Sequence, residues 1–453
     1  MTVRFERCDE AMLRAARAVA ERLVAAGHEA LFAGGCVRDA WLGRPFKDID
    51  IATSATPDQV EAIFAGQTVA VGKAFGVVLV LRDGYTFDVA TFRTDGDYAD
   101  GRHPNDVHFG TPEDDALRRD FTVNGLFCEP ASGVIRDYVG GVPDLKARVI
   151  RAIGDPVARF REDHLRMLRA ARFASVLDFT LDPATQAAMM AHAAWIKWVS
   201  AERIASEMTR LLCESPRPSV GLRLLRVTGL LREFLPEVEA LYGTEQPPRY
   251  HPEGDVWTHT CLMLDDVPAP RDPVLAWSLL LHDIGKPVTF CRKDDAEDDG
   301  NQIRFPSHAP VGAAMAEVIL KRLKQPTALI EQVKAVVADH MRGADAEKMR
   351  PATLRRFMGS PVFPVLLEVM RLDIKHSNKQ SAPWLFLKEA FEAFRAEPVL
   401  PPPLVMGRDL VAWGIAPGPR VGALLRELYD AQLEGRLTTR EEAQAYIASL
   451  DNN

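Results

Sequence analysis

The sequence has no hydrophobic run long enough to cross a membrane. No apolar stretch reaches the roughly 18 residues that a spanning helix needs, and residues 1–7 lack the apolar core of a signal peptide. Hydrophobic residues still make up 47% of the 453 residues, which is enough for large buried cores and about three domains by length. We therefore expect a cytoplasmic protein with no membrane partner.

Cysteine is scarce and shows no pattern. The sequence contains no C-x-x-C pair and no spacing typical of a disulfide framework. The six cysteines are Cys8, Cys36, Cys128, Cys213, Cys261 and Cys291. We expect free thiols in a reducing compartment.

An excess of positive charge is also missing. The net charge of −8 disfavours a protein that is basic over its whole surface. Arginines are dense between residues 148 and 172, however, and Arg223, Arg226 and Arg232 follow. They could form a basic stripe that binds RNA in a salt-dependent way, although the last three could equally well solvate helix faces.

The most informative segment begins with a glycine turn. Gly34 and Gly35 follow a predicted strand at residues 29–33. Because they lack side chains, their backbone N–H groups can approach a triphosphate, and Arg38 supplies positive charge. A helix expected at about residues 37–42 would direct its N-terminus at the same phosphates.

Two carboxylates follow on a second predicted strand, residues 47–53. Since side chains alternate along a strand, Asp48 and Asp50 share one face, and such oxygen ligands suit Mg²⁺. Asp88, on a later predicted strand at residues 85–92, is either a third carboxylate of this group or a solvated strand residue. Three carboxylates could hold two metal ions, one activating an attacking 3′-hydroxyl and one clamping a triphosphate. The combination predicts nucleotidyl transfer, with Asp48, Asp50 and Asp88 as catalytic residues.

These motifs resemble those of the bacterial tRNA nucleotidyltransferase and poly(A) polymerase family, of the polymerase-β nucleotidyltransferase type. The resemblance covers most of the chain and implies addition of nucleotides to an RNA 3′ end without a nucleic-acid template. Its motifs are Gly34-Gly35-x-x-Arg38-Asp39, Asp48-x-Asp50, Arg118-Arg119-Asp120-Phe121-Thr122-x-Asn124 and Glu162-Asp163-x-x-Arg166, continuing through Glu202-Arg203, Gly407-Arg408-Asp409-Leu410 and Pro417-Gly418-Pro419.

The arginine-rich second motif offers further nucleotide contacts. Arg118 and Arg119 can donate to phosphate or ribose, Asp120 can fix an arginine, and Asn124 can bond a sugar hydroxyl. The plainer interpretation is an Arg–Asp surface pair. The polar, glycine-rich segment at residues 94–104 precedes this motif and is too long for a simple hairpin. In the resembled family the corresponding loop is mobile and helps to switch nucleotide specificity.

The third motif is expected to choose the base. Helical spacing over residues 159–173 predicts that Arg166, Arg169 and Arg172 follow one helix, with Asp163 one turn before Arg166. A carboxylate accepts from an exocyclic amine and a guanidinium donates to a ring nitrogen. Cytosine and adenine offer that pattern, whereas uracil and guanine present a carbonyl and a ring N–H. The alternative is a salt-bridged helix whose arginines face solvent.

Metal-ligand residue types appear again after residue 251, on segments predicted to be helical. In chain order they are His259, His282, Asp283, His308, His340 and Asp373. This order resembles the His-Asp (HD) phosphohydrolase superfamily, which implies hydrolysis of phosphoesters around one or two divalent metals. Imidazole and carboxylate ligands suit Mn, Ni, Fe or Mg better than a thiolate-type zinc site. A lone histidine would more often be structural.

The predicted fold is an α+β polymerase-β-type nucleotidyltransferase head followed by an all-α neck, body and tail. We expect the catalytic head at residues 1–150 and a helical neck with the base-selecting motif at residues 151–235. An HD-type metal phosphohydrolase domain would occupy residues 236–395, and a helical C-terminal module residues 396–453.

The predicted function is template-independent addition of CCA to the 3′ end of tRNA from CTP and ATP. Mg²⁺ would serve the head, and a second divalent metal (Mn, Ni or Fe) the HD domain. Within the class, a poly(A) polymerase or an enzyme adding only part of CCA carries the same motifs. From another class, an HD phosphohydrolase could have a head that only binds nucleotide or RNA. The intact pair Asp48 and Asp50 discriminates against this alternative, because a head that no longer catalysed nucleotide addition would have less need of both carboxylates.

Overall fold

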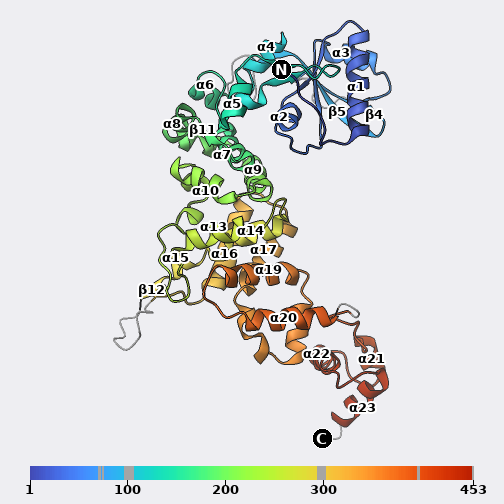
Figure 1. Ribbon diagram of the computed structural model, residues 1–453. Coiled ribbons are helices and arrows are strands. Elements are labelled where there is room, and N and C mark those ends of the chain that lie inside the picture. The colour runs from blue at the N-terminus through green and yellow to red at the C-terminus, as the bar shows by residue number, and fades with distance from the viewer. Residues whose placement is uncertain (70–72, 74–75, 96–106, 293–302, 395–397, 451–453) are drawn as a thin grey trace. The chain divides into compact units, whose positions relative to one another are not determined.

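The computed structural model describes residues 1–69, 73, 76–95, 107–292, 303–394 and 398–450. They divide into two compact units (Figure 1). The first comprises residues 1–239 and 268–270, and the second comprises residues 240–267 and 271–453. The predicted division into four domains is finer than this and stays a prediction. Most of the segment predicted as a specificity loop, residues 94–104, lies outside the described residues.

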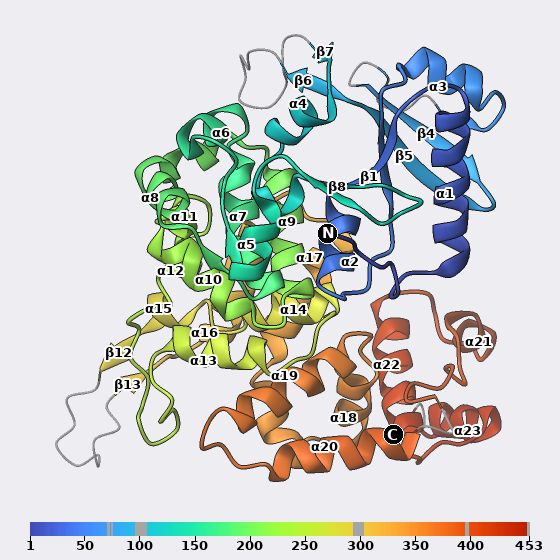
Figure 2. The same cartoon turned by 45° about the horizontal axis from the view of Figure 1, so that its top comes forward.

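The first unit begins with a mixed seven-stranded sheet of order β3-β4-β5-β2-β1-β8-β9. At its centre, β2 (Asp50–Thr53) runs parallel to β5 (Tyr85–Thr91) and antiparallel to β1 (Ala30–Ala33). The other strands are β3 (Thr68–Val69), β4 (Val77–Arg82), β8 (Leu126–Cys128) and β9 (Ile135–Asp137). Helices α1 (Glu10–Ala25) and α3 (Pro57–Ile63) cover one face of the sheet (Figure 2).

The opposite face of the sheet carries the carboxylates. Ile51 and Val89 are register partners in β2 and β5, and both are buried. Because neighbouring residues point to opposite faces, Asp50 and Asp88, each one residue earlier, lie together on the other face. A strand over residues 47–53 was predicted, but β2 begins only at Asp50. Its partner β1 ends opposite Asp50, where the chain leaves the sheet and enters α2 (Gly35–Trp41).

Helices make up the rest of the first unit. The helix predicted at residues 159–173 is two helices, α6 (Pro156–Glu162) and α7 (Leu165–Leu177). The break occurs at Asp163, whose backbone is extended and whose carboxylate accepts a hydrogen bond from the Leu165 N–H at 3.1 Å. The buried helix α7 packs against α9 (Ala201–Glu214) and α10 (Pro218–Val227). Along the chain, α8 (Pro183–His192) and the 3₁₀ helix η3 (Ala193–Trp198) come after α7 and before α9.

The second unit is mostly helical. The apolar helix α14 (Pro273–Leu281) contacts α13 (Val256–Asp265), α17 (Thr327–Asp339) and α19 (Phe363–Lys375), and α16 (His308–Arg322) packs on α17. The last helices, α21 (Gly407–Ala412), α22 (Pro419–Leu433) and α23 (Arg440–Leu450), have a core of their own. The predicted α+β head followed by helices is confirmed. Over the described ranges, no helix combines the length and apolarity that crossing a membrane requires.

Candidate functional site

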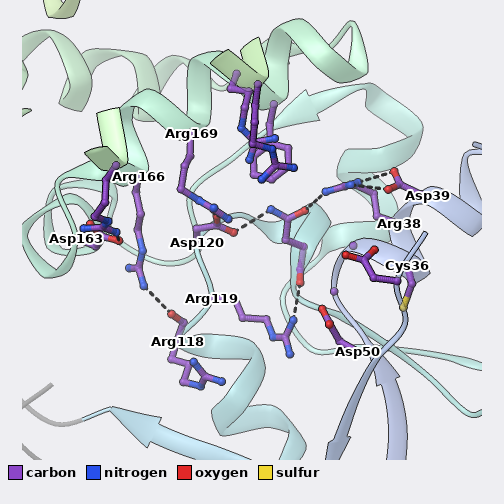
Figure 3. Close-up of a pocket in the computed structure, with 18 residues that line it drawn as sticks. Cys36, Arg38, Asp39, Asp50, Arg118, Arg119, Asp120, Asp163, Arg166 and Arg169 are labelled. Carbon is purple, nitrogen blue, oxygen red and sulfur yellow. Dashed lines mark hydrogen bonds and ion pairs between the residues drawn. The ribbon is translucent and has the colours of Figure 1, made fainter. Parts of the chain in front are cut away.

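A pocket of about 500 Å³ opens between the face of the sheet that bears Asp50 and the helices α7 and α9 (Figure 3). It brings together residues from all the motifs of the first unit. The predicted residues that line it are Gly35, Arg38, Asp48, Asp50, Arg118, Arg119, Asp120, Asn124, Asp163, Arg166, Arg169 and Arg172. Asp88 is not among its lining residues.

The predicted catalytic carboxylates are close enough to interact. Desolvation and the charges of Asp48 and Asp88 raise the pKa of Asp50 to about 6, although Arg119 opposes the shift. Three carboxylates that repel one another become stable together when a cation lies between them. Their oxygens are ligands that Mg²⁺ prefers, so the residues present fit the predicted metal.

The glycine turn is required by its geometry. Gly34 has a φ of 71°, a conformation that favours glycine, and a Cβ added there would lie 2.7 Å from Nη1 of Arg119. The next residue, Gly35, starts α2. The backbone therefore passes close to both Arg119 and Asp50 without a side chain in between.

A chain of hydrogen bonds links α2 to α7 (Figure 3). Arg38 donates to Oδ1 of Asn124 at 2.5 Å, and Nδ2 of Asn124 donates to Asp120 at 2.9 Å. Asp120 in turn accepts from Arg169 at 2.7 and 2.9 Å. Burial alone would raise the pKa of Asp120, but the charge of Arg169 and the bond from Asn124 lower it to about 2. Asp120 thus fixes an arginine, as predicted, whereas the sugar contact of Asn124 stays a prediction.

The two predicted base-reading residues are held by different partners. Arg203 of α9 donates to Asp163 at 2.7 Å. Arg166 donates to the backbone carbonyls of Arg118 and Arg159 at 3.0 and 3.1 Å. The predicted placement of Asp163 one helical turn before Arg166 was wrong, because Asp163 lies outside α7, yet both side chains line the same pocket.

Two carboxylates that were not predicted hold the arginines. Asp115, which is buried, pairs with Arg118 at 2.5 Å and with Arg119 at 2.9 Å. Glu207 of α9 pairs with Arg172 at 2.5 Å and lies 3.5 Å from Arg169. The spacing of Asp115 three and four residues before its arginines was a readable signal. Nothing comparable pointed to Glu207, because its partners come from another helix.

The cysteine of the pocket is an unreactive thiol. All six cysteines are free, as predicted. Burial, reinforced by the charge of Asp50, raises the pKa of Cys36, and its thiol donates to the carbonyl of Ala33 at 3.3 Å. It therefore stays protonated at neutral pH.

The second unit gathers all six predicted metal ligands in one place. Nε2 of His259 lies 3.3 Å from Asp373, and Nε2 of His282 lies 3.1 Å from Asp283. On the other side of Asp283, Nε2 of His308 and of His340 lie 3.6 and 3.7 Å from Oδ1. Asp283 thus belongs to two groups of ligand atoms, His259 with His282 and His308 with His340. Carboxylate oxygens and imidazoles at these separations fit one or two divalent cations.

The Nδ1 atoms orient these histidines. In His282, His308 and His340, Nδ1 lies 2.8 to 2.9 Å from a carbonyl oxygen three residues earlier, so Nδ1 carries the proton and Nε2 is left for a metal. His259 is held instead by Glu253 at 2.7 Å. Burial alone would lower the pKa of His259, but its bonds to Asp373 and Glu253 raise it to about 9. A proton on His259 therefore competes with a metal.

Three further charged residues of this centre were not predicted. Oε1 of Glu253 bridges two histidines, with Nδ1 of His259 at 2.7 Å and Nδ1 of His251 at 2.8 Å. Lys286 pairs with Asp283 at 2.7 Å, and Lys379 with Asp373 at 2.6 Å. Glu253 precedes α13 and Lys379 follows α19, so helical periodicity gave no reason to single them out.

Three family models match the chain. The family described as "Poly A polymerase head domain" matches residues 30–151, "Probable RNA and SrmB- binding site of polymerase A" matches residues 178–242, and "HD domain" matches residues 254–373. The multifunctional CCA protein of Halorhodospira halophila is 35% identical over 415 residues, which cover 87% of this chain and 94% of that protein. The chain belongs to the tRNA nucleotidyltransferase and poly(A) polymerase family.

Other members of the tRNA nucleotidyltransferase family match it less evenly. The A-adding tRNA nucleotidyltransferase of Deinococcus radiodurans is 36% identical over 74% of this chain and 78% of its own. The CCA-adding enzyme of Geobacillus thermodenitrificans is 48% identical over 45% of this chain, and the match spans 50% of that enzyme. A crystal structure of the Bacillus stearothermophilus CCA-adding enzyme in complex with CTP is 28% identical, with a TM-score of 0.73 over 98% of each chain.

Proposed function

We propose that this protein adds CCA to the 3′ end of tRNA, using CTP and ATP. The observation that carries the proposal is the single pocket in which Asp48 and Asp50 face a set of fixed arginines across a glycine turn. Negative groups that hold a cation and positive groups that hold a triphosphate are the two requirements of nucleotidyl transfer. The CTP-bound relative of the same fold supports this choice of substrate.

The residues of the pocket divide the work. Mg²⁺ held by Asp48 and Asp50 would activate the 3′-hydroxyl of the RNA and neutralise the leaving pyrophosphate. Arg119 and the backbone N–H groups after Gly34 bind the triphosphate. Asp88 supplies a third negative charge beside Asp50. Because the arginines are already held by carboxylates and carbonyls, little reorganisation is needed when a nucleotide binds.

Asp163 and Arg166 choose the base. Asp163 accepts from the exocyclic amine of cytosine or adenine, and Arg166 donates to the ring nitrogen beside it. The bond from Arg203 orients the Asp163 carboxylate, and the carbonyl bonds of Arg166 set the direction of its guanidinium. Fixed side chains of this kind can select a base without a template.

The experiment uses three tRNAs that end before CCA, after the first C and after CC. Purified protein is mixed with each tRNA, Mg²⁺ and one labelled nucleotide at a time. CCA addition predicts that CTP extends the first two tRNAs by two and one nucleotides, that ATP extends the third by one, and that UTP and GTP extend none. Because one relative is an A-adding tRNA nucleotidyltransferase, a second outcome is considered. Extension of the third tRNA alone would show that the protein adds only A. A long run of A would show poly(A) synthesis, and no extension of any tRNA would refute the proposal.

The second unit has a separate activity in this proposal, hydrolysis of phosphoesters at the site formed by Asp283 and the other five ligands. The fixed Nε2 atoms and the two buried carboxylates support a divalent metal, namely Mn, Ni, Fe or Mg. That metal would polarise the phosphoester and lower the pKa of an attacking water.

Removing two of these ligands tests the second activity. His282→Ala with Asp283→Ala should abolish metal-dependent hydrolysis of small substrates such as 2′,3′-cyclic nucleotides. Phosphate release with each metal in turn, metal content and thermal unfolding are measured on the same preparation. A structural metal would instead make the double variant less stable. Unchanged hydrolysis at wild-type stability would refute the metal site.

A further inference from the structure

Two tryptophans of the first unit, Trp195 and Trp198, lie outside the lining of the nucleotide pocket. Trp198, the last residue of η3, is 71% exposed, more than any other large hydrophobic side chain among the described residues. Trp195, one turn earlier, is half-buried. Burial in a core therefore explains the position of Trp195 in part but does not explain that of Trp198.

Polar rings and a cation surround the two tryptophans. His192 stacks on Trp195 with ring centroids 4.0 Å apart, and the guanidinium of Arg161 lies 5.9 Å from the Trp195 centroid. His164 lies 5.3 Å from both indole rings. We call these five residues the aromatic platform. In the part of the chain that the structure describes, no carboxylate pairs with Arg161, so its charge is available.

The aromatic platform adjoins the nucleotide pocket. His164 directly follows Asp163, which lines the pocket, and Arg161 comes two residues before it. Trp198 is also close to the pocket along the chain, because Arg203, which donates to Asp163, comes five residues after it. The same corner of the neck therefore presents base-reading groups to the pocket and aromatic rings to the surface beside it.

An exposed indole ring near a guanidinium that no carboxylate pairs with, as the described residues show for Trp198 and Arg161, is typical of surfaces that bind unpaired RNA. Bases stack on aromatic side chains, and arginine contacts phosphate or stacks in turn. The family model described as a probable RNA-binding site includes both tryptophans. We propose that the aromatic platform binds the unpaired 3′ strand of the RNA substrate, with a base stacked on Trp198 and a phosphate near Arg161. This rests on the proposed function, which places an RNA 3′ end in the adjoining pocket.

The test compares two RNAs and three variants. One RNA is a tRNA with unpaired 3′ nucleotides, and the other is the same tRNA trimmed to a blunt acceptor stem. Dissociation constants are measured at one fixed salt concentration without nucleotide. Trp198→Ala should weaken binding of the first RNA about 5-fold or more but hardly affect the second, since stacking requires an unpaired base. Trp198→Phe should keep most of the affinity. Met190→Ala, on α8, is the matched control because Met190 is also exposed (55%) and lies outside the platform.

Two further measurements separate a binding role from a structural one. The melting temperature and the KM for CTP should be unchanged in Trp198→Ala, while the KM for tRNA rises. Wild-type affinity of Trp198→Ala for both RNAs, or an equal loss for both, would overturn the proposal, and the first result would leave the ring as a site for a protein partner. If the wild-type protein extends no tRNA, the proposed function fails instead, whatever Trp198→Ala does.

Discussion

At the scale of single residues, most charged side chains of the head pocket are fixed in position by an ion pair with a residue of opposite charge. Asp115 pairs with Arg118, and Glu207 pairs with Arg172. Arg203 pairs with Asp163. Asp50 is different, because burial and the like charges of Asp48 and Asp88 raise its pKa more than the charge of Arg119 lowers it. The metal-free pocket is therefore strained at Asp50, and its properties should depend on pH and on Mg²⁺.

Asp50→Asn should make the metal-free protein more stable at pH 8. The pKa of Asp50, about 6 in the folded protein, exceeds the value of 3.8 expected without the fold. Ionisation of Asp50 therefore opposes folding. The stability that the protonated carboxyl contributes is fully present below about pH 4 and is lost as the pH rises through about 6. The variant should gain of the order of 1–2 kcal/mol over wild type at pH 8, after discounting for solvent screening, and much less at pH 4.5. Urea unfolding in EDTA measures this gain, and an equal gain at both pH values would contradict it. Added Mg²⁺ should stabilise the wild type more than Asp50→Asn, because the variant has lost one carboxylate of the head pocket.

Changing Asp163 should affect base choice more than nucleotide binding. In Asp163→Ala the exocyclic amine has no acceptor, so incorporation of UTP and GTP should rise relative to CTP and ATP by about tenfold, the scale of one lost charged hydrogen bond. Arg203→Ala keeps the Asp163 carboxylate but removes the side chain that orients it, and should give a smaller change in the same direction. Incorporation with each labelled nucleotide measures both variants. Full preference for C and A in Asp163→Ala would place base choice elsewhere.

At the scale of elements, the sequence predicted what its local pattern controls. The glycine turn and the helical arginines are local features, and both are present. Asp48 and Asp50 line one pocket, but only Asp50 belongs to β2, so their predicted alternation along one strand is not confirmed. The start of β2 was not predictable, because it depends on where its partner β1 ends. The break at Asp163 was not predictable either, because it depends on the hydrogen bond from the Leu165 N–H to the Asp163 carboxylate. The order of metal ligands in the second unit was readable, whereas Glu253 lies outside any periodic segment.

The turn before α2 gives a prediction at this scale. Gly34→Ala should abolish nucleotide addition and destabilise the first unit, because a Cβ both opposes the positive φ and meets Arg119 at 2.7 Å. Gly27→Ala is the matched control, since Gly27 also has a positive φ, 89°, but no atom lies within 4 Å of an added Cβ. It should cost about 1 kcal/mol and leave addition intact. Equal losses of activity in the two variants would show that backbone strain, not contact with Arg119, matters at Gly34.

At the scale of the whole molecule, two sets of polar groups occupy two compact units. The pocket of Asp48 and Asp50 lies in the first unit, and the ligands around Asp283 lie in the second. Each unit has its own core and supplies its own ligands. The two chemistries should therefore be separable by mutation, with each set of variants losing one activity and keeping the other.

The most direct measurement is transfer of labelled CMP and AMP to tRNA lacking CCA, by wild type, Asp48→Ala, Asp50→Ala and the double variant of His282 and Asp283. Loss of a carboxylate that holds the metal removes charge stabilisation from the transition state, so either aspartate variant should transfer at least about 100-fold more slowly while still binding tRNA. The double variant should transfer at the wild-type rate. Transfer near the wild-type rate by Asp48→Ala or Asp50→Ala would contradict the assignment of the head pocket as the site of nucleotide addition.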